Sequence, residues 1–219
     1  MDECDEISLP SDTLKILHEF LQEKQKREED EQHKIENKLG KEATFEENWQ
    51  LSQFWYSKST KKILSSVVRK LVDNATKDNF KIALLSCPSL YCVVKETHPN
   101  VKIFEYDKRF SAYGDDFIFY DINEAITLTH LQDEWNSFDL IIADPPFLSE
   151  ECIIKISEII TNLGKDNSKI IFCSGATVET WLIKYLNLKK CRYRPEHERN
   201  LGNEFATYAN FELDNFIEL

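Results

Sequence analysis

The stretch Asp139-Leu-Ile-Ile-Ala-Asp-Pro-Pro-Phe-Leu-Ser-Glu-Glu-Cys152 decides how this chain folds. Residues 140–143 are continuously apolar, which is typical of a strand covered on both faces in a parallel sheet. The two prolines that follow cannot donate hydrogen bonds to a neighbouring strand, so the strand must end there. The tetrapeptide Asp144-Pro145-Pro146-Phe147 is therefore expected at the carboxyl end of a strand, where open α/β sheets bind their ligands.

A helix is expected directly after this tetrapeptide. Ser149 is a suitable N-cap, and Glu150 and Glu151 place negative charge in the first turn. Apolar residues then recur at helical spacing until Gly164. The tetrapeptide is thus predicted to be a stiff corner between a buried strand and a helix.

The corner offers the groups that would hold an amino group. Asp144 supplies carboxylate oxygens, the prolines supply backbone carbonyls, and Phe147 supplies a flat aromatic face. The string resembles the [Asn/Asp]-Pro-Pro-[aromatic] signature of S-adenosylmethionine-dependent amino-methyltransferases. This resemblance implies catalytic roles for Asp144, Pro145, Pro146 and Phe147. The alternative is a plain turn before a helix, with a buried Phe147.

The rest of the chain alternates strands with helices, which predicts a parallel sheet with right-handed crossovers. Strands are expected at 81–87, 102–107, 117–121, 140–143 and 169–174, and a closing β pair at 190–194 and 205–211; helices are expected at 59–74, 88–97, 123–131, after Ser149 and after Gly175. The predicted fold is α/β: a Rossmann-like class I methyltransferase fold with a mostly parallel seven-stranded sheet and helices on both faces. Residues 45–219 would form this domain, preceded by an acidic helical extension at 1–44.

Composition and charge limit the classes of protein to which this chain can belong. The chain has 42% hydrophobic residues and no apolar run approaching eighteen residues, so we expect a soluble, cytoplasmic protein without membrane contact. The six cysteines show no zinc spacing, which favours reduced thiols and no metal site. The net charge is −12, whereas an enzyme that acts on duplex nucleic acid needs a basic surface. Stable nucleic-acid binding is therefore not expected.

The cofactor side is predicted from the strand ends. Glu105 is the favoured ribose ligand with Asp107 second, Tyr106 lies between them, and Asp121 could meet an adenine amino group. The first loop, Ser86-Cys87-Pro88, occupies the place where methyltransferases commonly have a Gly-x-Gly turn. Carboxylates at strand ends also occur for solubility alone.

The segment 45–56 places five aromatic residues in twelve positions. Such a density indicates either core packing or the wall of a binding site. We interpret the segment as a lid over the cofactor, with Gln53, Phe54 and Trp55 as contacts.

Four stretches together carry a closer resemblance: Trp49–Tyr56, Phe104–Phe110, Asp144–Cys152 and Arg199–Phe205. In this order and at these spacings they are similar to the elongation factor 1-alpha lysine methyltransferase family, once assigned to adenine-N6 methylation of DNA because of the Asp-Pro-Pro-aromatic string. The resemblance runs from about residue 45 to 211. It implies S-adenosylmethionine as cofactor and elongation factor 1-alpha as substrate. The family pattern usually has tyrosine at Phe147.

Three hypotheses follow. The first is a monomeric protein-lysine methyltransferase, because an acidic enzyme attracts a basic protein substrate. The second is an adenine-N6 methyltransferase, and the third is a catalytically silent adaptor that binds a basic partner. Arg199, Asn203 and Glu204 are predicted to line the substrate side, or else to form a structural hairpin, and Phe205 is predicted in the core.

Overall fold

The corner at Asp144 terminates the central strand of a seven-stranded sheet with the order β3-β2-β1-β4-β5-β7-β6. The computed structural model describes residues 45–75, 79–127, 129–199 and 204–217, so the extension expected at 1–44 lies outside the described residues. The strands are β1 (Ile82–Leu85), β2 (Val101–Glu105), β3 (Phe117–Phe119), β4 (Phe138–Ala143), β5 (Gly164–Gly175), β6 (Lys189–Lys190) and β7 (Phe205–Ala209).

The sheet is mostly parallel, as predicted. Strands β1 to β5 run parallel to their neighbours, while β7 is antiparallel to both β5 and β6. An antiparallel pair closes the sheet as expected, with β7 inside the predicted 205–211, but the first strand of the pair is only Lys189–Lys190 rather than 190–194. All six residues of β4 are buried, which agrees with the apolar run that predicted it.

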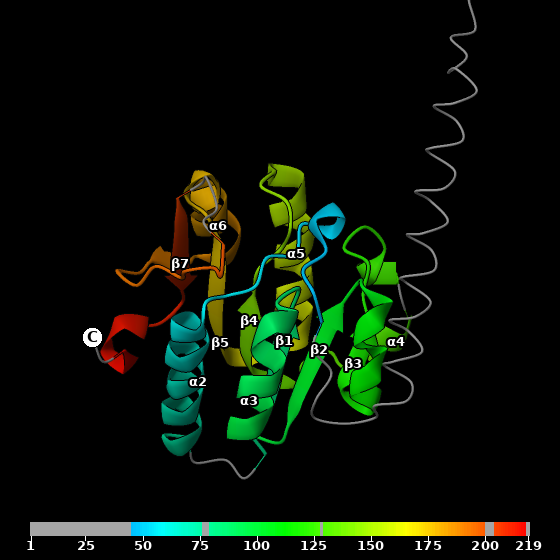
Figure 1. Ribbon diagram of the computed structural model, residues 1–219. Helices are drawn as coiled ribbons and strands as arrows, with labels where there is room; N and C mark the ends of the chain where they lie inside the picture. The colour runs from blue at the N-terminus through cyan, green and yellow to red at the C-terminus, as the bar shows by residue number, and fades with distance from the viewer. Residues whose placement is uncertain (1–44, 76–78, 128, 200–203, 218–219) are drawn as a thin grey trace, which may run out of the picture. The chain divides into compact units, whose positions relative to one another are not determined.

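Helices cover both faces of the sheet (Figure 1). The helices are α2 (Lys58–Asp73), α3 (Tyr91–Thr97), α4 (Thr129–Gln132), α5 (Glu150–Leu163) and α6 (Glu179–Leu186). Alternate residues of each strand enter two separate cores: Leu84 packs with α2 and α3, whereas Leu85 packs with α5 and α6. This alternation is the consequence of the two-residue period of a strand.

Helix α5 begins as the sequence predicts. The Ser149 side chain accepts a hydrogen bond from the Cys152 backbone N–H at 3.2 Å, and Glu150 and Glu151 occupy the first turn. Such a cap stabilises a helix by about 1 kcal/mol. The helix start therefore fixes where the Asp-Pro-Pro-Phe corner ends.

Two further predicted elements also differ in extent from the structure. In place of one helix over 123–131 there is a short 3-10 helix, η4 (Ala125–Thr127), followed by α4. Before η4, the Asp121 carboxylate accepts a hydrogen bond from the Asn123 N–H at 2.8 Å, a local bond that competes with a regular helix. Strand β5 begins at Gly164 rather than residue 169, with an irregular register between its two ends.

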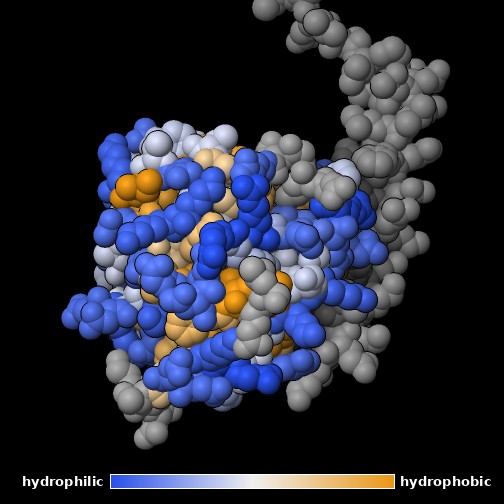
Figure 2. All heavy atoms as spheres, turned by 90° about the vertical axis from the view of Figure 1, so that its left-hand side faces the viewer, coloured by the Kyte–Doolittle hydropathy of each residue, from blue (hydrophilic) through white to orange (hydrophobic). Residues whose placement is uncertain are grey.

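The edge of the sheet at β6 is short and charged. It consists of Lys189 and Lys190, both exposed, and charged residues on an edge strand discourage pairing with another chain. Figure 2 views the molecule from this side and shows a largely hydrophilic surface around small hydrophobic areas. No helix of the described part is long and apolar enough to span a membrane.

Candidate active site

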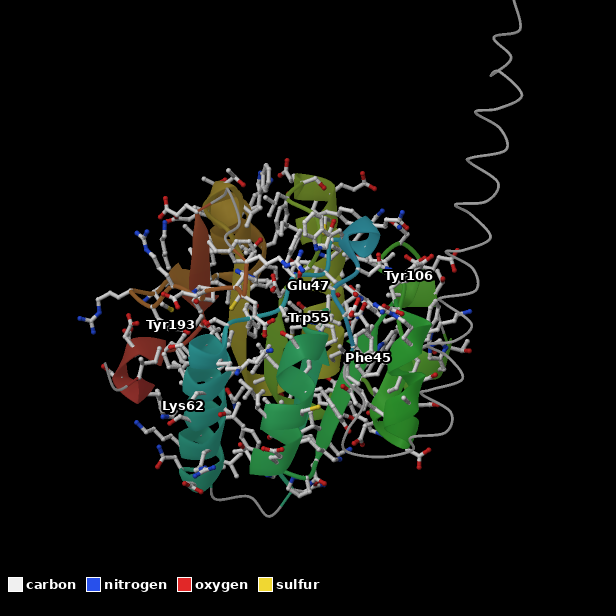
Figure 3. All side chains as sticks on the ribbon, in the orientation of Figure 1. Phe45, Glu47, Trp55, Lys62, Tyr106 and Tyr193 are labelled. Carbon is white, nitrogen blue, oxygen red and sulfur yellow. The ribbon has the colours of Figure 1, made fainter. Side chains whose placement is uncertain are left out.

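A cavity of about 600 Å³ lies at the carboxyl ends of the parallel strands. Its lining comes from the first loop, from the ends of β2, β3 and β4, and from residues 50–56, which pass above the sheet. In Figure 3 Trp55 of this segment and Glu47, which precedes the segment in the chain, lie close together near the centre of the view, and the Trp55 backbone N–H donates to Glu47 Oε1 at 2.8 Å. A cavity of this size suits a small organic ligand.

Most of the predicted site residues lie in this one cavity. The lining includes Gln53, Phe54, Trp55, Ser86, Cys87, Pro88, Glu105, Tyr106, Asp121, Asp144, Pro145, Pro146 and Phe147. They come from separate parts of the chain, which the strand order brings to one edge of the sheet. The lining does not include Asp107, Arg199 or Glu204, and Asn203 lies outside the described residues.

Asp144 is the one acidic residue of the Asp-Pro-Pro-Phe corner. Its backbone N–H donates to the Leu85 carbonyl at 3.0 Å, and its Oδ2 accepts a hydrogen bond from the Tyr56 hydroxyl at 2.6 Å. Burial raises the pKa of Asp144 to about 7, and the bond from Tyr56 opposes this rise. No described residue donates to Oδ1, so this oxygen is open to a ligand.

The sequence analysis missed the role of Tyr56. Its side chain is 1% exposed, and burial raises its pKa well above the usual value, so the phenol stays protonated and donates to Asp144. It is the last residue of the aromatic segment 45–56 and is separated from Asp144 by 88 positions. Only the fold reveals this pair, because nothing local in the sequence links the two residues.

Glu105, at the end of β2, presents a carboxylate to the cavity. Its Oε1 accepts backbone hydrogen bonds from Tyr106 at 3.1 Å and Asp107 at 3.3 Å, with Gln53 Nε2 at 3.5 Å. Burial raises the pKa of Glu105 to about 7. No described residue donates to Oε2, which leaves an acceptor where a ribose hydroxyl could donate.

Asp107 does not face the cavity, in contrast to its prediction as second ribose ligand. Its Oδ2 forms an ion pair with Arg109 at 2.7 Å and accepts from Gln53 Nε2 at 3.1 Å. Its Oδ1 accepts from the Arg109 backbone N–H at 3.0 Å. Both carboxylate oxygens of Asp107 therefore bond to Arg109 or Gln53. Asp107 contributes to the site by holding Gln53 in place.

Tyr120 supports the view that the cavity takes a polar ligand. It lines the cavity just before Asp121 and is 2% exposed, yet its buried hydroxyl has no hydrogen-bond partner of normal geometry among the described residues. Its pKa is raised well above the usual value by burial, and the Ser86 side chain opposes this rise. A buried polar atom without a partner is costly, so a ligand with a donor or acceptor would fit here.

The first loop turns without glycine. Ser86 adopts a φ of 55°, in the left-handed region that favours glycine. The backbone therefore makes at Ser86 the kind of turn for which a glycine is expected, at a cost of about 1–2 kcal/mol for a residue with a Cβ. Pro88 then begins a 3-10 helix, η2 (Pro88–Leu90), that leads into α3.

The aromatic segment serves both purposes that its sequence suggested. Phe54 and Tyr56 line the cavity, whereas Phe45 packs against the core residue Phe110 with ring centroids 4.6 Å apart. Trp55 does both: it lines the cavity, and its ring lies 6.3 Å from that of Phe110.

The Asp-Pro-Pro-Phe corner and the loop that precedes β7 both contribute to the lining of the cavity. Phe147 is 52% exposed, so the predicted burial of its ring in the alternative reading is wrong. Phe205, predicted in the core, is half-buried and lines the cavity together with His197. Arg199 instead forms an ion pair with Glu47 at 3.3 Å and lies over the Trp49 ring, and Glu204 pairs with Arg194 at 3.1 Å.

Metal-ligating side chains do not gather anywhere in the described part of the chain. No three His, Cys, Asp or Glu residues there form a group that could hold an ion. The cysteines that the structure describes are unpaired thiols. The site is thus built from carboxylates, aromatic rings and backbone groups.

The fold and the cavity together define a class of protein. A sheet of order β3-β2-β1-β4-β5-β7-β6 with an antiparallel β7, and an Asp-Pro-Pro-Phe corner after β4, is the architecture of a class I methyltransferase.

Comparison with known proteins agrees with this class. Residues 47–213 match the family described as "Probable N6-adenine methyltransferase". The chain is 58% identical to protein-lysine N-methyltransferase CG9154 of Drosophila melanogaster, covering 98% of both chains. It is 43% identical to EEF1A lysine methyltransferase 1 of Mus musculus, covering 97% of both. Fibrillarin of Aeropyrum pernix, solved with S-adenosyl-L-methionine, is 14% identical with a TM-score of 0.44, over 68% of this chain and 73% of that one.

The chain belongs to the family of protein-lysine N-methyltransferases that includes EEF1A lysine methyltransferase 1. The predicted family and fold are confirmed, and the chain is a methyltransferase.

Proposed function

We propose that this protein transfers a methyl group from S-adenosylmethionine to a lysine of elongation factor 1-alpha. The supporting observation is that one cavity contains both the Asp144 corner and the acceptors of Glu105 and Asp121. The Asp144 corner would hold the amine, and Glu105 and Asp121 would hold a nucleoside. Relatives that match nearly the whole chain are named for this activity.

The cofactor residues fit a nucleoside that carries hydroxyl and amino donors. Glu105 would accept from the ribose, Asp121 would accept from the adenine amino group, and the Tyr120 hydroxyl would gain the partner that it lacks among the described residues. Ser86, Cys87 and Pro88 would follow the backbone of the ligand, and Gln53, Phe54 and Trp55 would cover it. S-adenosylmethionine bound in this way supplies a methyl group on a positively charged sulfur.

Asp144 would position the reacting nitrogen. Its Oδ2 is fixed by Tyr56, so its Oδ1 can accept a hydrogen bond from the lysine amine and orient the lone pair. A lysine has a pKa of about 10.4 and must lose a proton before it can react. Burial of the amine in the cavity at Asp144 disfavours the charged form and helps release that proton, whereas the Asp144 carboxylate favours the charged form, so Asp144 mainly positions the nitrogen.

The substrate is proposed to be a basic protein rather than nucleic acid. The net charge of −12 would repel a phosphate backbone and attract a lysine-rich surface. We further propose that the enzyme works in the cytoplasm as a monomer and that residues 45–219 form its methyltransferase domain.

The test is a methyl-transfer assay with tritium-labelled S-adenosylmethionine and either purified elongation factor 1-alpha or DNA. Label is expected in the protein alone. Asp144→Ala should abolish transfer and leave cofactor affinity within about threefold of wild type, because Asp144 contacts the amine. Asp121→Ala should instead weaken cofactor binding by about tenfold, the loss of one good hydrogen bond.

Three results would contradict the proposal. Label in DNA alone would favour adenine methylation, and a wild-type protein that gives no calorimetric signal with S-adenosylmethionine would favour an adaptor. Transfer by Asp144→Ala at the wild-type rate would reject the role of Asp144.

A further inference from the structure

Residues 196–198, in the loop that precedes β7, are hydrogen-bonded to residues 55–57 at the end of the segment that passes above the sheet. The Glu198 N–H donates to the Trp55 carbonyl and the Ser57 N–H donates to the Glu196 carbonyl, both at 2.8 Å. These bonds form an isolated antiparallel bridge that sets His197 directly opposite Tyr56. Figure 1 shows the two segments meeting near the start of α2. The backbone therefore fixes where the imidazole of His197 lies.

Three aromatic rings form a continuous surface at this place. The His197 ring lies 5.0 Å from the Tyr56 ring and 4.6 Å from the Phe205 ring, and all three side chains line the cavity. We call Tyr56, His197 and Phe205 the ring wall. At its inner end the Tyr56 hydroxyl bonds to Asp144. The ring wall therefore leads to the carboxylate where the reacting amine is proposed to sit.

The exposed fractions of the side chains that line the cavity differ from residue to residue. Tyr56 is 1% exposed, His197 and Phe205 are half-buried, and Phe147 on the same cavity is 52% exposed. Tyr106, which also lines the cavity, is 51% exposed, so the cavity is open at more than one place; on the Phe147 side the lining becomes more buried toward Tyr56 and Asp144. A side chain that enters there passes aromatic faces over its length.

The chemistry of His197 suits the passage of a cationic chain. Burial lowers the pKa of His197 to about 4, and the nearby Glu47 only partly opposes this, so the imidazole is neutral at physiological pH. A neutral ring does not repel an ammonium group, and aromatic faces attract cations and pack against methylene groups. Among the described residues the His197 ring contacts the rings of Tyr56 and Phe205 and forms no hydrogen bond, so its contacts there are those of an aromatic face.

We propose that the ring wall forms one side of the channel through which the substrate lysine reaches Asp144, and that His197 is a substrate-positioning residue within it. This proposal rests on the proposed lysine methylation. In this proposal the methylene groups of the substrate lysine pack against the face of the His197 imidazole. Neither ring nitrogen has to bond to the substrate, and His197 takes no part in proton transfer.

The test compares three variants of the full-length enzyme. His197→Ala removes the ring and should raise KM for elongation factor 1-alpha by about tenfold or more, which corresponds to the packing of a few methylene groups. His197→Phe keeps an aromatic face and should stay within about threefold of wild-type kcat/KM. The control is His98→Gln, which changes a histidine that lies outside the cavity, beside the Phe80 ring with centroids 6.0 Å apart, and should leave KM unchanged.

Cofactor binding separates this proposal from its competitor, a contact between His197 and S-adenosylmethionine. The Kd of His197→Ala for S-adenosylmethionine should stay within about twofold of wild type. A parallel loss of cofactor affinity would place His197 in the cofactor site and overturn the proposal. Equal defects in His197→Phe and His197→Ala would also overturn it, because the nitrogens and not the face would then matter.

Folding and activity of the wild type provide the remaining checks. Should His197→Ala not fold, His197→Leu fills a similar volume without an aromatic face and should show the same rise in KM. An unchanged KM in either variant would overturn the proposal. Absence of methyl transfer by the wild-type enzyme would instead count against lysine methylation itself, so the two failures are distinguishable.

Discussion

The pairing of Tyr56 with Asp144 is the residue-scale feature on which the proposed chemistry depends. Asp144 could be predicted from the sequence because the prolines beside it form a recognisable corner. Tyr56 could not, since its partner lies 88 positions away and its own segment contains five aromatic residues of similar appearance. A tertiary hydrogen bond of this kind leaves no local pattern, so only the fold identifies it.

Removal of the Tyr56 hydroxyl tests its effect on Asp144. Tyr56→Phe deletes a hydrogen bond of 2.6 Å to a buried carboxylate, and we expect kcat/KM to fall by about 10- to 100-fold. The bond lowers the pKa of Asp144, so its loss should also move the acid limb of the pH–rate profile to higher pH. Steady-state kinetics between about pH 6 and pH 9 would measure both effects.

Tyr91→Phe is the matched control for this substitution. Tyr91 donates to Asp116 at 2.7 Å, the same kind of pair, and neither residue lines the cavity. Its pH–rate profile should remain that of wild type. A shifted profile in both variants, or in neither, would show that Tyr56 does not act through Asp144.

The role of Ser86 could not be recognised from its residue type. The first loop lacks the glycines that are common in methyltransferases, yet Ser86 itself adopts the left-handed conformation. The geometry is thus preserved although the favoured residue is not. Sequence patterns report which residues are common at such a turn, not which backbone angles a given chain accepts.

At the scale of elements, the segment above the cavity depends on a polar cluster behind it. Arg109 donates to Asp107 at 2.9 Å, to Gln53 Oε1 at 3.2 Å and to the Glu46 carbonyl at 3.3 Å. Gln53 in turn lines the cavity and approaches Glu105. The planar guanidinium thus joins the end of β2 to the segment that covers the ligand.

Arg109→Lys should therefore weaken cofactor binding. An ammonium cannot reproduce the fork of hydrogen bonds, and we expect the Kd for S-adenosylmethionine to rise by about 3- to 10-fold in calorimetry. The control is Arg192→Lys, which alters the Arg192–Asp214 pair with an Arg side chain that is 82% exposed. That pair should be energetically minor, and an unchanged Kd in Arg109→Lys would reject the coupling.

The order of elements was largely predictable, and their bounds less so. Strand β1, residues 140–143 of β4 and the capped helix α5 have strong local signals: continuous apolar runs and an N-cap serine. The region after β3 has weak ones, and it forms the short 3-10 helix η4 and the short helix α4 in place of the single helix expected there. Asp107 was misplaced because a strand-end carboxylate can turn toward a neighbouring arginine as readily as toward a ligand.

At the scale of the whole molecule, buried acids connect stability to pH. Burial raises the pKa of Asp144 and Glu105 to about 7, so the fold retains their protons where the unfolded chain has lost them. Their contribution to the free energy of unfolding is complete below about pH 4 and is lost as pH rises to about 7. His197 acts in the opposite sense between its folded pKa of about 4 and its usual value of 6.5.

Asp144→Asn isolates one of these contributions. Without a titrating group at this position, the variant should gain stability relative to wild type between about pH 5 and pH 8, by up to about 3 kcal/mol, because one pKa unit corresponds to about 1.4 kcal/mol. Urea denaturation of both proteins without cofactor, at the two pH values, would measure this difference. An identical pH dependence would mean that Asp144 is already ionised in the folded protein at the lower pH.

The place of β7 in the sheet has a consequence for biosynthesis. Residues 205–209 insert between β5 and β6, although every other described strand precedes them in the chain. A nascent polypeptide on the ribosome therefore displays the unpaired side of β5 until residues 205–209 have emerged. Premature termination before this point should yield an aggregation-prone product that cellular quality control removes, even though its catalytic corner has already been translated.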